Sequence, residues 1–227
     1  GGFSSSATMD LNQGKLDVAK DFELTGGKLD INRGKVVVKG NILHSSGIMD
    51  IHIGSLEVAG DYRLQNRTVS EDKITYGNSS GYIVMTRDSD SVKIGGDLYI
   101  QNYNYSNNLT AGTIELKGNF TQKKGYDSNF IPSGTHKLIL NGTTTQTINF
   151  EAGANSRFNY LDASQAAGVL VTSATISAST FIGLEKVSVP NGTATLTLAN
   201  TNAKLTGDGS IKSGLSLTGG SLDLSGK

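Results

Sequence analysis

Three gap-free copies of a twenty-residue unit decide the fold of this chain. Residues 9–24 read MDLNQGKLDVAKDFEL, residues 29–44 read LDINRGKVVVKGNILH, and residues 49–64 read MDIHIGSLEVAGDYRL. Each copy has an apolar residue and Asp at its start, then Gly, then alternating apolar residues, then Asp or Asn. A fixed period of this length is typical of solenoids, in which each repeat forms one coil.

Within each copy, apolar and polar residues alternate, as in Leu16-Asp17-Val18 and Phe22-Glu23-Leu24. Period two predicts short β-strands with one buried face. We expect the intervening Gly, Asn and Asp to form turns, because Gly supplies positive φ without strain and Asn and Asp tolerate it.

Units of two or three short strands cannot bury their own apolar face, so successive units must stack, ~4.8 Å apart. We therefore predict an all-β fold, a single-stranded parallel β-solenoid and specifically a right-handed β-helix, with coils of about twenty residues and loop insertions. The alternative is an antiparallel β-sandwich, which also shows alternation and frequent turns. Its strands, however, have no reason to repeat in register.

The repeat continues beyond the third copy. Residues 65–81 interrupt the period, and Val92–Ile100 then matches Leu56–Leu64 position by position. A further copy begins at Ile114 and a looser one at Lys137. We predict one continuous solenoid over residues 1–227, with regular coils in 9–64, loop-bearing coils in 65–164 and Ala/Ser/Thr/Gly-rich coils in 165–227.

The composition limits the possible partners. Lys and Arg together number 20, as do Asp and Glu, and there is no Cys. The balanced charge argues against a nucleic-acid partner, and the lack of Cys excludes disulfides and thiolate metal sites. No apolar run approaches the ~18 residues of a membrane span, so we expect none. We expect no cofactor and see no signal peptide.

Tyrosines are concentrated in the loop-bearing region. A candidate carbohydrate platform comprises Tyr76, Tyr82, Tyr103, Tyr105 and Tyr126. The phenol ring offers a flat apolar face with a hydroxyl group, which suits stacking on sugar rings. The alternative, which we favour, is that these side chains pin long loops to the solenoid wall.

A column of acidic residues is the candidate cation-binding face. A period of twenty stacks Asp10, Asp30 and Asp50, with Asn12, Asn32 and His52 beside them. Carboxylates at coil spacing repel unless a lysine or a cation lies between them. We favour a solvated ladder balanced by lysines and predict no metal site. Asp88-Ser89-Asp90-Ser91 lacks the Gly and distal Glu of an EF-hand, so we interpret it as a polar turn.

We expect no catalytic residues. A catalytic carboxylate should break the repeat, and the acidic residues that do so are Glu71, Asp72, Asp88, Asp90 and Asp127. None has a His or Arg neighbour in a recognisable arrangement, so a polysaccharide-degrading enzyme is only a remote alternative. Candidate glycosylation sites are the Asn-x-Ser/Thr sequons at Asn66, Asn78, Asn104, Asn108, Asn119, Asn141 and Asn191.

Longer stretches carry a family resemblance. GGDLYIQNYNYS, LTAGTIELKGNFTQKKG, SNFIPSGTHKLILNGTTTQTINF and FNYLDAS resemble the repeats of secreted and cell-surface proteins of bacteria, which have GKLxVxGDF-type motifs. The likeness covers roughly residues 9–165. It implies an extracellular β-solenoid with a surface or scaffold role, similar to modules found beside adhesive, carbohydrate-binding or wall-anchoring domains.

These observations favour a non-enzymatic extracellular structural protein, namely a stalk, an adhesin module or a head-to-tail filament subunit. Solenoid ends expose unpaired strand edges, and neither end of this sequence has a polar cap. We therefore expect the ends to meet other copies or neighbouring repeats. The alternative function is a carbohydrate-binding module that uses the tyrosine-rich loops and holds polysaccharide.

Overall fold

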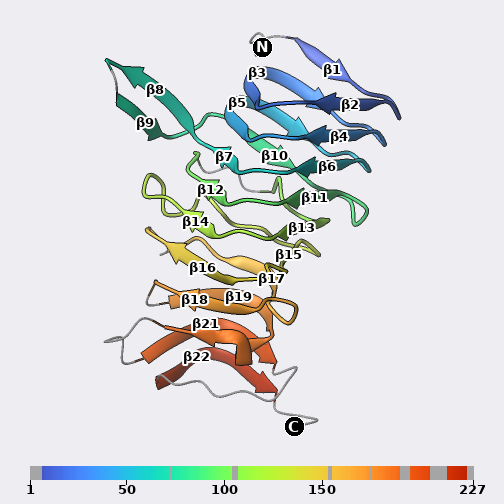
Figure 1. The fold of residues 1–227 in the computed structure, drawn as a ribbon. Coiled ribbons are helices and arrows are strands. Elements are labelled where there is room, and N and C mark those ends of the chain that lie inside the picture. Colours follow the sequence, from blue (N-terminus) through green and yellow to red (C-terminus); the bar gives the residue numbers. More distant parts are fainter. Residues whose placement is uncertain are drawn as a thin grey trace.

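The chain forms a parallel β-solenoid, as the repeat predicted, and not an antiparallel sandwich (Figure 1). A computed structural model describes residues 7–71, 73–103, 107–152, 155–173, 175–189, 195–204 and 214–223. The described strands form two ten-stranded sheets, all of whose pairings are parallel, and one two-stranded antiparallel hairpin. Each coil contributes a strand to the second sheet and then one to the first.

The first sheet contains, in spatial order, β1 (Thr8–Asp10), β3 (Phe22–Asp30), β5 (Ile42–Asp50), β7 (Tyr62–Leu64), β12 (Leu98–Ile100), β14 (Phe120–Gln122), β16 (Thr145–Phe150), β18 (Gly168–Val171) and β20 (Val187–Ser188), with β10 (Tyr82–Val84) also paired to β5. The second sheet contains β2 (Lys15–Val18), β4 (Lys35–Val38), β6 (Ser55–Val58), β11 (Ser91–Ile94), β13 (Thr113–Leu116), β15 (Lys137–Leu140), β17 (Phe158–Asp162), β19 (Thr175–Ile182), β21 (Thr195–Lys204) and β22 (Gly214–Asp223). A short 3-10 helix, Leu184–Lys186, precedes β20.

The strand register follows the repeat. Val36 pairs with Leu56, and Leu56 pairs with Val92 across the first insertion. Val92 in turn pairs with Ile114, and Ile114 with Leu138. Insertions between strands therefore leave the stack undisturbed.

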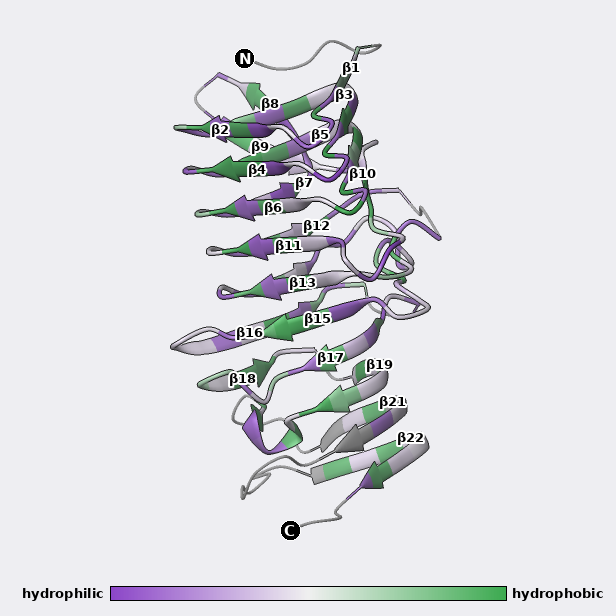
Figure 2. Cartoon of the chain, turned by 90° about the vertical axis from the view of Figure 1, so that its right-hand side faces the viewer, coloured by the Kyte–Doolittle hydropathy of each residue, from purple (hydrophilic) through white to green (hydrophobic). Residues whose placement is uncertain are grey.

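The core runs between the sheets as columns of inward-facing side chains. Figure 2 shows hydrophobic and hydrophilic residues alternating along the strands of the second sheet. Leu29, Met49 and Ile83 stack in one such column, and each is at most 5% exposed. Midway along the solenoid four phenylalanine rings pack with centroids 4.9–5.7 Å apart, namely Phe120, Phe130, Phe150 and Phe158.

The turns that lead into the first strands of the second sheet differ from our expectation. Positive φ falls on Asn12 (40°) and Gln13 (71°), and not on the Gly14 that follows them. Gly14 is needed because a Cβ there would lie 2.7 Å from the carbonyl oxygen of Leu11. The same pattern recurs at Asn32, Arg33 and Gly34 and at His52, Ile53 and Gly54.

The turns from the second sheet to the first are joined by a ladder of Asp and Asn side chains. In each step, the backbone N–H of one residue donates to Oδ1 of the equivalent residue one coil earlier, at 2.7–2.9 Å. We call this column the Asx ladder, and it comprises Asp21, Asn41, Asp61, Asp97 and Asn119. The ladder ends where Thr147 donates its N–H to Asn119.

The first insertion forms an antiparallel hairpin, β8 (Asn66–Ser70) and β9 (Lys73–Gly77), which projects from the side of the solenoid (Figure 1). It leaves the first sheet after β7 and returns before β10. The sequence predicted a loop here, but Asn66–Ser70 and Lys73–Gly77 pair as two exposed antiparallel strands.

Candidate functional site

The structure brings two of the candidate tyrosines together. The rings of Tyr103 and Tyr126 lie 5.0 Å apart between centroids at an angle of 54°. Tyr103 follows β12 and Tyr126 follows β14, so neighbouring coils supply the two rings. Both side chains are 42% exposed. Tyr105 lies outside the described residues.

Backbone contacts hold both tyrosines. The N–H of Tyr103 donates to Ser79 of the previous coil at 3.3 Å. The buried amide of Gln122 donates to the carbonyl oxygen of Tyr126 at 3.2 Å. The solenoid wall therefore holds the backbone of both residues, and their rings contact each other.

Tyr76 belongs to a different cluster. The guanidinium carbon of Arg63 lies 5.1 Å from the centroid of the Tyr76 ring and 3.8 Å from that of Tyr99. Arg63 donates to Oδ2 of Asp61 at 2.9 Å, and the Tyr99 hydroxyl donates to Oδ2 of Asp97 at 2.9 Å. Burial and this hydrogen bond raise the pKa of Tyr99. The cluster occupies the outer oxygens of two adjacent acids of the Asx ladder, which is a structural role.

Tyr82 lies neither beside the Tyr103–Tyr126 pair nor in the Arg63 cluster. It is half-buried on β10 and lines a small cavity of about 30 Å³ together with Leu64 and Leu109. The amide oxygens of Asn102 and Asn129 also border this region without a hydrogen-bond partner among the described residues. The described tyrosines of the candidate carbohydrate platform therefore lie in three separate places and do not form one binding surface.

A polar groove lies at the corner where the hairpin leaves the first sheet. Its volume is about 550 Å³. The corner groove is lined by Glu23, Thr25, Leu43, Ser45, Ser46, Asn66, Arg67, Asn78, Ser80 and Tyr103. The repeat does not predict this groove, because one of its walls is a hairpin that falls outside the repeat.

Hydrogen bonds and one ion pair connect the groove residues. Arg67, on the hairpin, reaches Glu23 on the wall at 2.5 Å. The Ser80 hydroxyl donates to the Ser46 hydroxyl at 2.8 Å. A Cβ at Gly125 would lie 2.2 Å from the Asn78 amide oxygen, so the loop that carries Tyr126 packs directly against the groove. Tyr103 lines one end of the corner groove, and Tyr126 lies beside it through the ring contact with Tyr103.

The acidic column contains a lysine. Lys28 Nζ lies 2.8 Å from a carboxylate oxygen of both Asp30 and Asp50. His52 Nδ1 is 3.0 Å from Asp30, and Asn32 donates to Asp10 at 3.0 Å. Burial opposes the charged form of Lys28, but its hydrogen bonds to the two acids and their charges outweigh this effect and raise its pKa.

Asp30, Asp50 and His52 each offer a ligand atom, and these atoms lie within 4.8 Å of one another, as a metal site would require. The ammonium group of Lys28, however, lies between the two carboxylates. Lys28 thus balances the charges of Asp30 and Asp50, which are less exposed than the solvated ladder that we expect from the sequence. The absence of a metal site stays a prediction.

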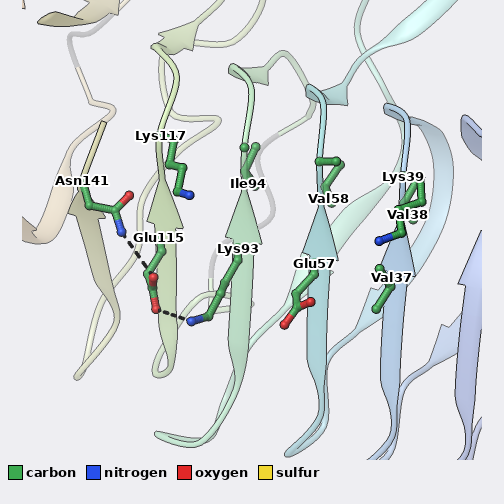
Figure 3. Close-up of a pocket in the computed structure, with 12 residues that line it drawn as sticks. Val37, Val38, Lys39, Glu57, Val58, Lys93, Ile94, Glu115, Lys117 and Asn141 are labelled. Carbon is green, nitrogen blue, oxygen red and sulfur yellow. Dashed lines mark hydrogen bonds and ion pairs between the residues drawn. The ribbon is translucent and has the colours of Figure 1, made fainter. Parts of the chain in front are cut away.

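The outer face of the second sheet carries a shallow depression of about 430 Å³, shown in Figure 3. Lys93 pairs with Glu115 at 3.1 Å, and Asn141 donates to the same carboxylate at 3.3 Å. Lys35 pairs with Glu57 at 2.7 Å. Opposite charges alternate on adjacent coils here, so the face largely neutralises itself.

The acids that break the repeat do not converge on one place. Glu71 is at the hairpin tip, and Asp72 lies outside the described residues. The Asp88 carboxylate accepts a hydrogen bond from the Thr135 hydroxyl. The Asp127 carboxylate accepts one from the Asn155 amide at 2.8 Å. Asp90 is 1% exposed and accepts the N–H groups of Ile53, Thr86 and Arg87 at 2.6–3.0 Å. Asp90 therefore fixes the polar turn that the sequence predicted.

Several sequons are engaged in the fold. The amide of Asn119 takes part in the Asx ladder, and that of Asn141 bonds Glu115. Asn66 is exposed on β8, whereas Asn78 and Asn108 are half-buried. Asn104 and Asn191 lie outside the described residues. Asn66 is the most accessible of the described candidates.

Two histidines are buried. His44 accepts from the Tyr62 hydroxyl at 2.9 Å and donates from Nε2 to the Gly47 carbonyl oxygen at 3.0 Å. Burial lowers the pKa of both His44 and His136 to about 4. Burial also raises the pKa of Tyr62. Both histidines are neutral parts of the interior at neutral pH.

In comparisons with known proteins, no family model, curated protein or solved structure matched this chain. Within the part of the chain that the structure describes, no helix is long and apolar enough to cross a membrane.

Proposed function

We propose that this chain is a non-enzymatic structural module, a rigid β-solenoid spacer that works outside the cell. The observation that carries the proposal is the continuity of the stack. Ten strands of the second sheet pair in one unbroken series through the described residues. At ~4.8 Å per interval, nine intervals give a rod about 43 Å long.

The ladders support a mechanical role for the stack. Backbone hydrogen bonds join each coil to the next, and the Asx ladder adds a side-chain bond at each of five successive steps, including the last one to Thr147. The Arg63–Tyr99 stack and the Lys28 bridge connect further pairs of coils. Such a stack resists bending because hydrogen bonds and side-chain contacts join each coil to its neighbours on several sides.

Of the three structural roles, a stalk-like spacer is the one that the continuous stack supports most directly, because a rod of stacked coils holds whatever it joins at a fixed distance.

Solution scattering and electron microscopy across a concentration series test this proposal. We expect rods of constant length at every concentration. Filaments that lengthen with concentration would contradict the spacer role and show that the chain is a filament subunit. A flexible or globular particle would contradict both structural roles. Turnover of any member of a polysaccharide panel would refute the non-enzymatic assignment.

The extracellular location rests on the resemblance to secreted and surface repeat proteins. Surface labelling of intact source cells, followed by detection of this chain, tests it. We expect labelling without cell lysis, and labelling that requires lysis would place the module inside the cell.

A further inference from the structure

We propose that the corner groove binds a neutral polysaccharide chain, with the Tyr103–Tyr126 pair as a stacking platform for one of its sugar rings. The proposal goes beyond the spacer role, because a rod needs no groove on its side.

The groove has the chemistry that hydroxyl-rich ligands require. Most of its lining is neutral and polar, with the hydroxyls of Ser45, Ser46 and Ser80 and the amide of Asn66. Such groups exchange hydrogen bonds with sugar hydroxyls, and each hydroxyl can act as donor or acceptor. Carbohydrate is the ligand class that combines many hydroxyls with flat apolar ring faces.

The charges of the groove favour an uncharged ligand. Its charged lining residues, Glu23 and Arg67, form an ion pair with each other at 2.5 Å. Because Glu23 and Arg67 already neutralise each other, the groove offers no free counter-charge to an acidic polysaccharide or a charged peptide. A neutral glycan needs no counter-charge.

The tyrosine pair supplies an aromatic platform at one end. Both rings are 42% exposed, and neither hydroxyl has a partner among the described residues. Their backbones are held by Ser79 and Gln122, so little conformational entropy is lost when a ring stacks on them. The platform is thus formed before the ligand arrives.

The spacing of the coils sets the length of the site. Ser45, Ser80, Tyr103 and Tyr126 belong to four successive coils at the same corner. Three intervals of ~4.8 Å make about 14 Å, which accommodates several sugar rings along the solenoid axis. The ligand would therefore be a chain and not a single sugar.

Retention on a panel of neutral polysaccharides in affinity gel electrophoresis tests the proposal. Two variants disable the site in different ways: Tyr103→Ala with Tyr126→Ala removes the platform, and Ser45→Trp fills the groove. Tyr76→Ala is the matched control, because Tyr76 is also 42% exposed but packs on Arg63 outside the groove. Thermal unfolding of each variant checks that it is folded.

We expect the wild type to be retained by at least one neutral polysaccharide, and each groove variant to bind about tenfold more weakly, while Tyr76→Ala binds as the wild type does. The proposal is overturned if the wild type is retained by no neutral polysaccharide, if only acidic polysaccharides or peptides retain it, or if the groove variants bind unchanged. None of these results bears on the rod shape, which scattering measures separately.

Discussion

The amide oxygen of Asn41 accepts the backbone N–H of Asp61, the equivalent residue one coil later, at 2.8 Å. This bond explains why Asp or Asn recurs at that position. The Asn41 side-chain oxygen accepts a backbone N–H of the next coil and not one of its own turn. It also explains the preceding glycine, because a Cβ at Gly60 would lie 2.3 Å from the same amide oxygen. One step of the ladder thus accounts for two columns of the repeat.

Gly60→Ala should destabilise the fold strongly, because the new methyl group collides with Asn41 and breaks the ladder. We expect a loss of at least about 2 kcal/mol in the free energy of unfolding, measured by urea denaturation. Lys20→Ala is the matched control. Lys20 occupies the same column at the first step, where no earlier ladder residue is described, and we expect a change within about 0.5 kcal/mol. Equal effects at both positions would contradict the ladder explanation.

Asn41→Asp should destabilise the fold in a salt-dependent way. The Asn41 amide also donates to Asp21 at 3.1 Å, and a carboxylate there would repel both Asp21 and Asp61. We expect a loss of about 1 kcal/mol at low salt that shrinks as salt screens the repulsion. Asn41→Ala removes both hydrogen bonds of this side chain without adding charge, so its loss should be independent of salt. Parallel urea titrations at low and high NaCl make the comparison.

The repeat was sufficient to predict the solenoid, because Leu56 and Val92 could be aligned in spite of the insertion between them, and they do pair. The role of the Asp and Asn column was not predictable from alternation, since it depends on how one turn lies above the next. The sequence alone predicts Asn41 and its equivalents only as turn residues.

The candidate site was only partly visible in the sequence. Val92 and Ile114 are 22 residues apart, and the same offset carries Tyr103 to residue 125, next to Tyr126. The tyrosine contact could thus have been inferred from the period. The corner groove could not, because the hairpin that forms its other wall lies outside the repeat and its direction depends on packing.

Asp90→Ala should be among the most damaging substitutions of an acidic residue. It would leave three backbone N–H groups without their acceptor, one of them, Ile53, on the preceding coil. Each buried unpaired donor costs about 1 kcal/mol or more, so we expect a loss of about 3 kcal/mol in urea denaturation. Asp88→Ala is the control two residues away, where the exposed side chain has one hydroxyl partner. A similar loss for both would show that the turn, and not the Asp90 carboxylate, sets the stability.

Stability should fall as the pH drops from about 6.5 to 4, because His44 and His136 are buried as neutral rings with pKa values of about 4. In this window the unfolded chain binds protons that the folded chain does not, which favours unfolding by up to about 3 kcal/mol for each histidine. Their contribution is complete above pH 6.5. Urea denaturation at several pH values measures the slope. A His44→Gln, His136→Gln variant should flatten it in this window, whereas His52→Gln, at a partly exposed site bonded to Asp30, should retain most of it. A slope that persists in the double variant would mean that groups other than these two histidines take up the protons.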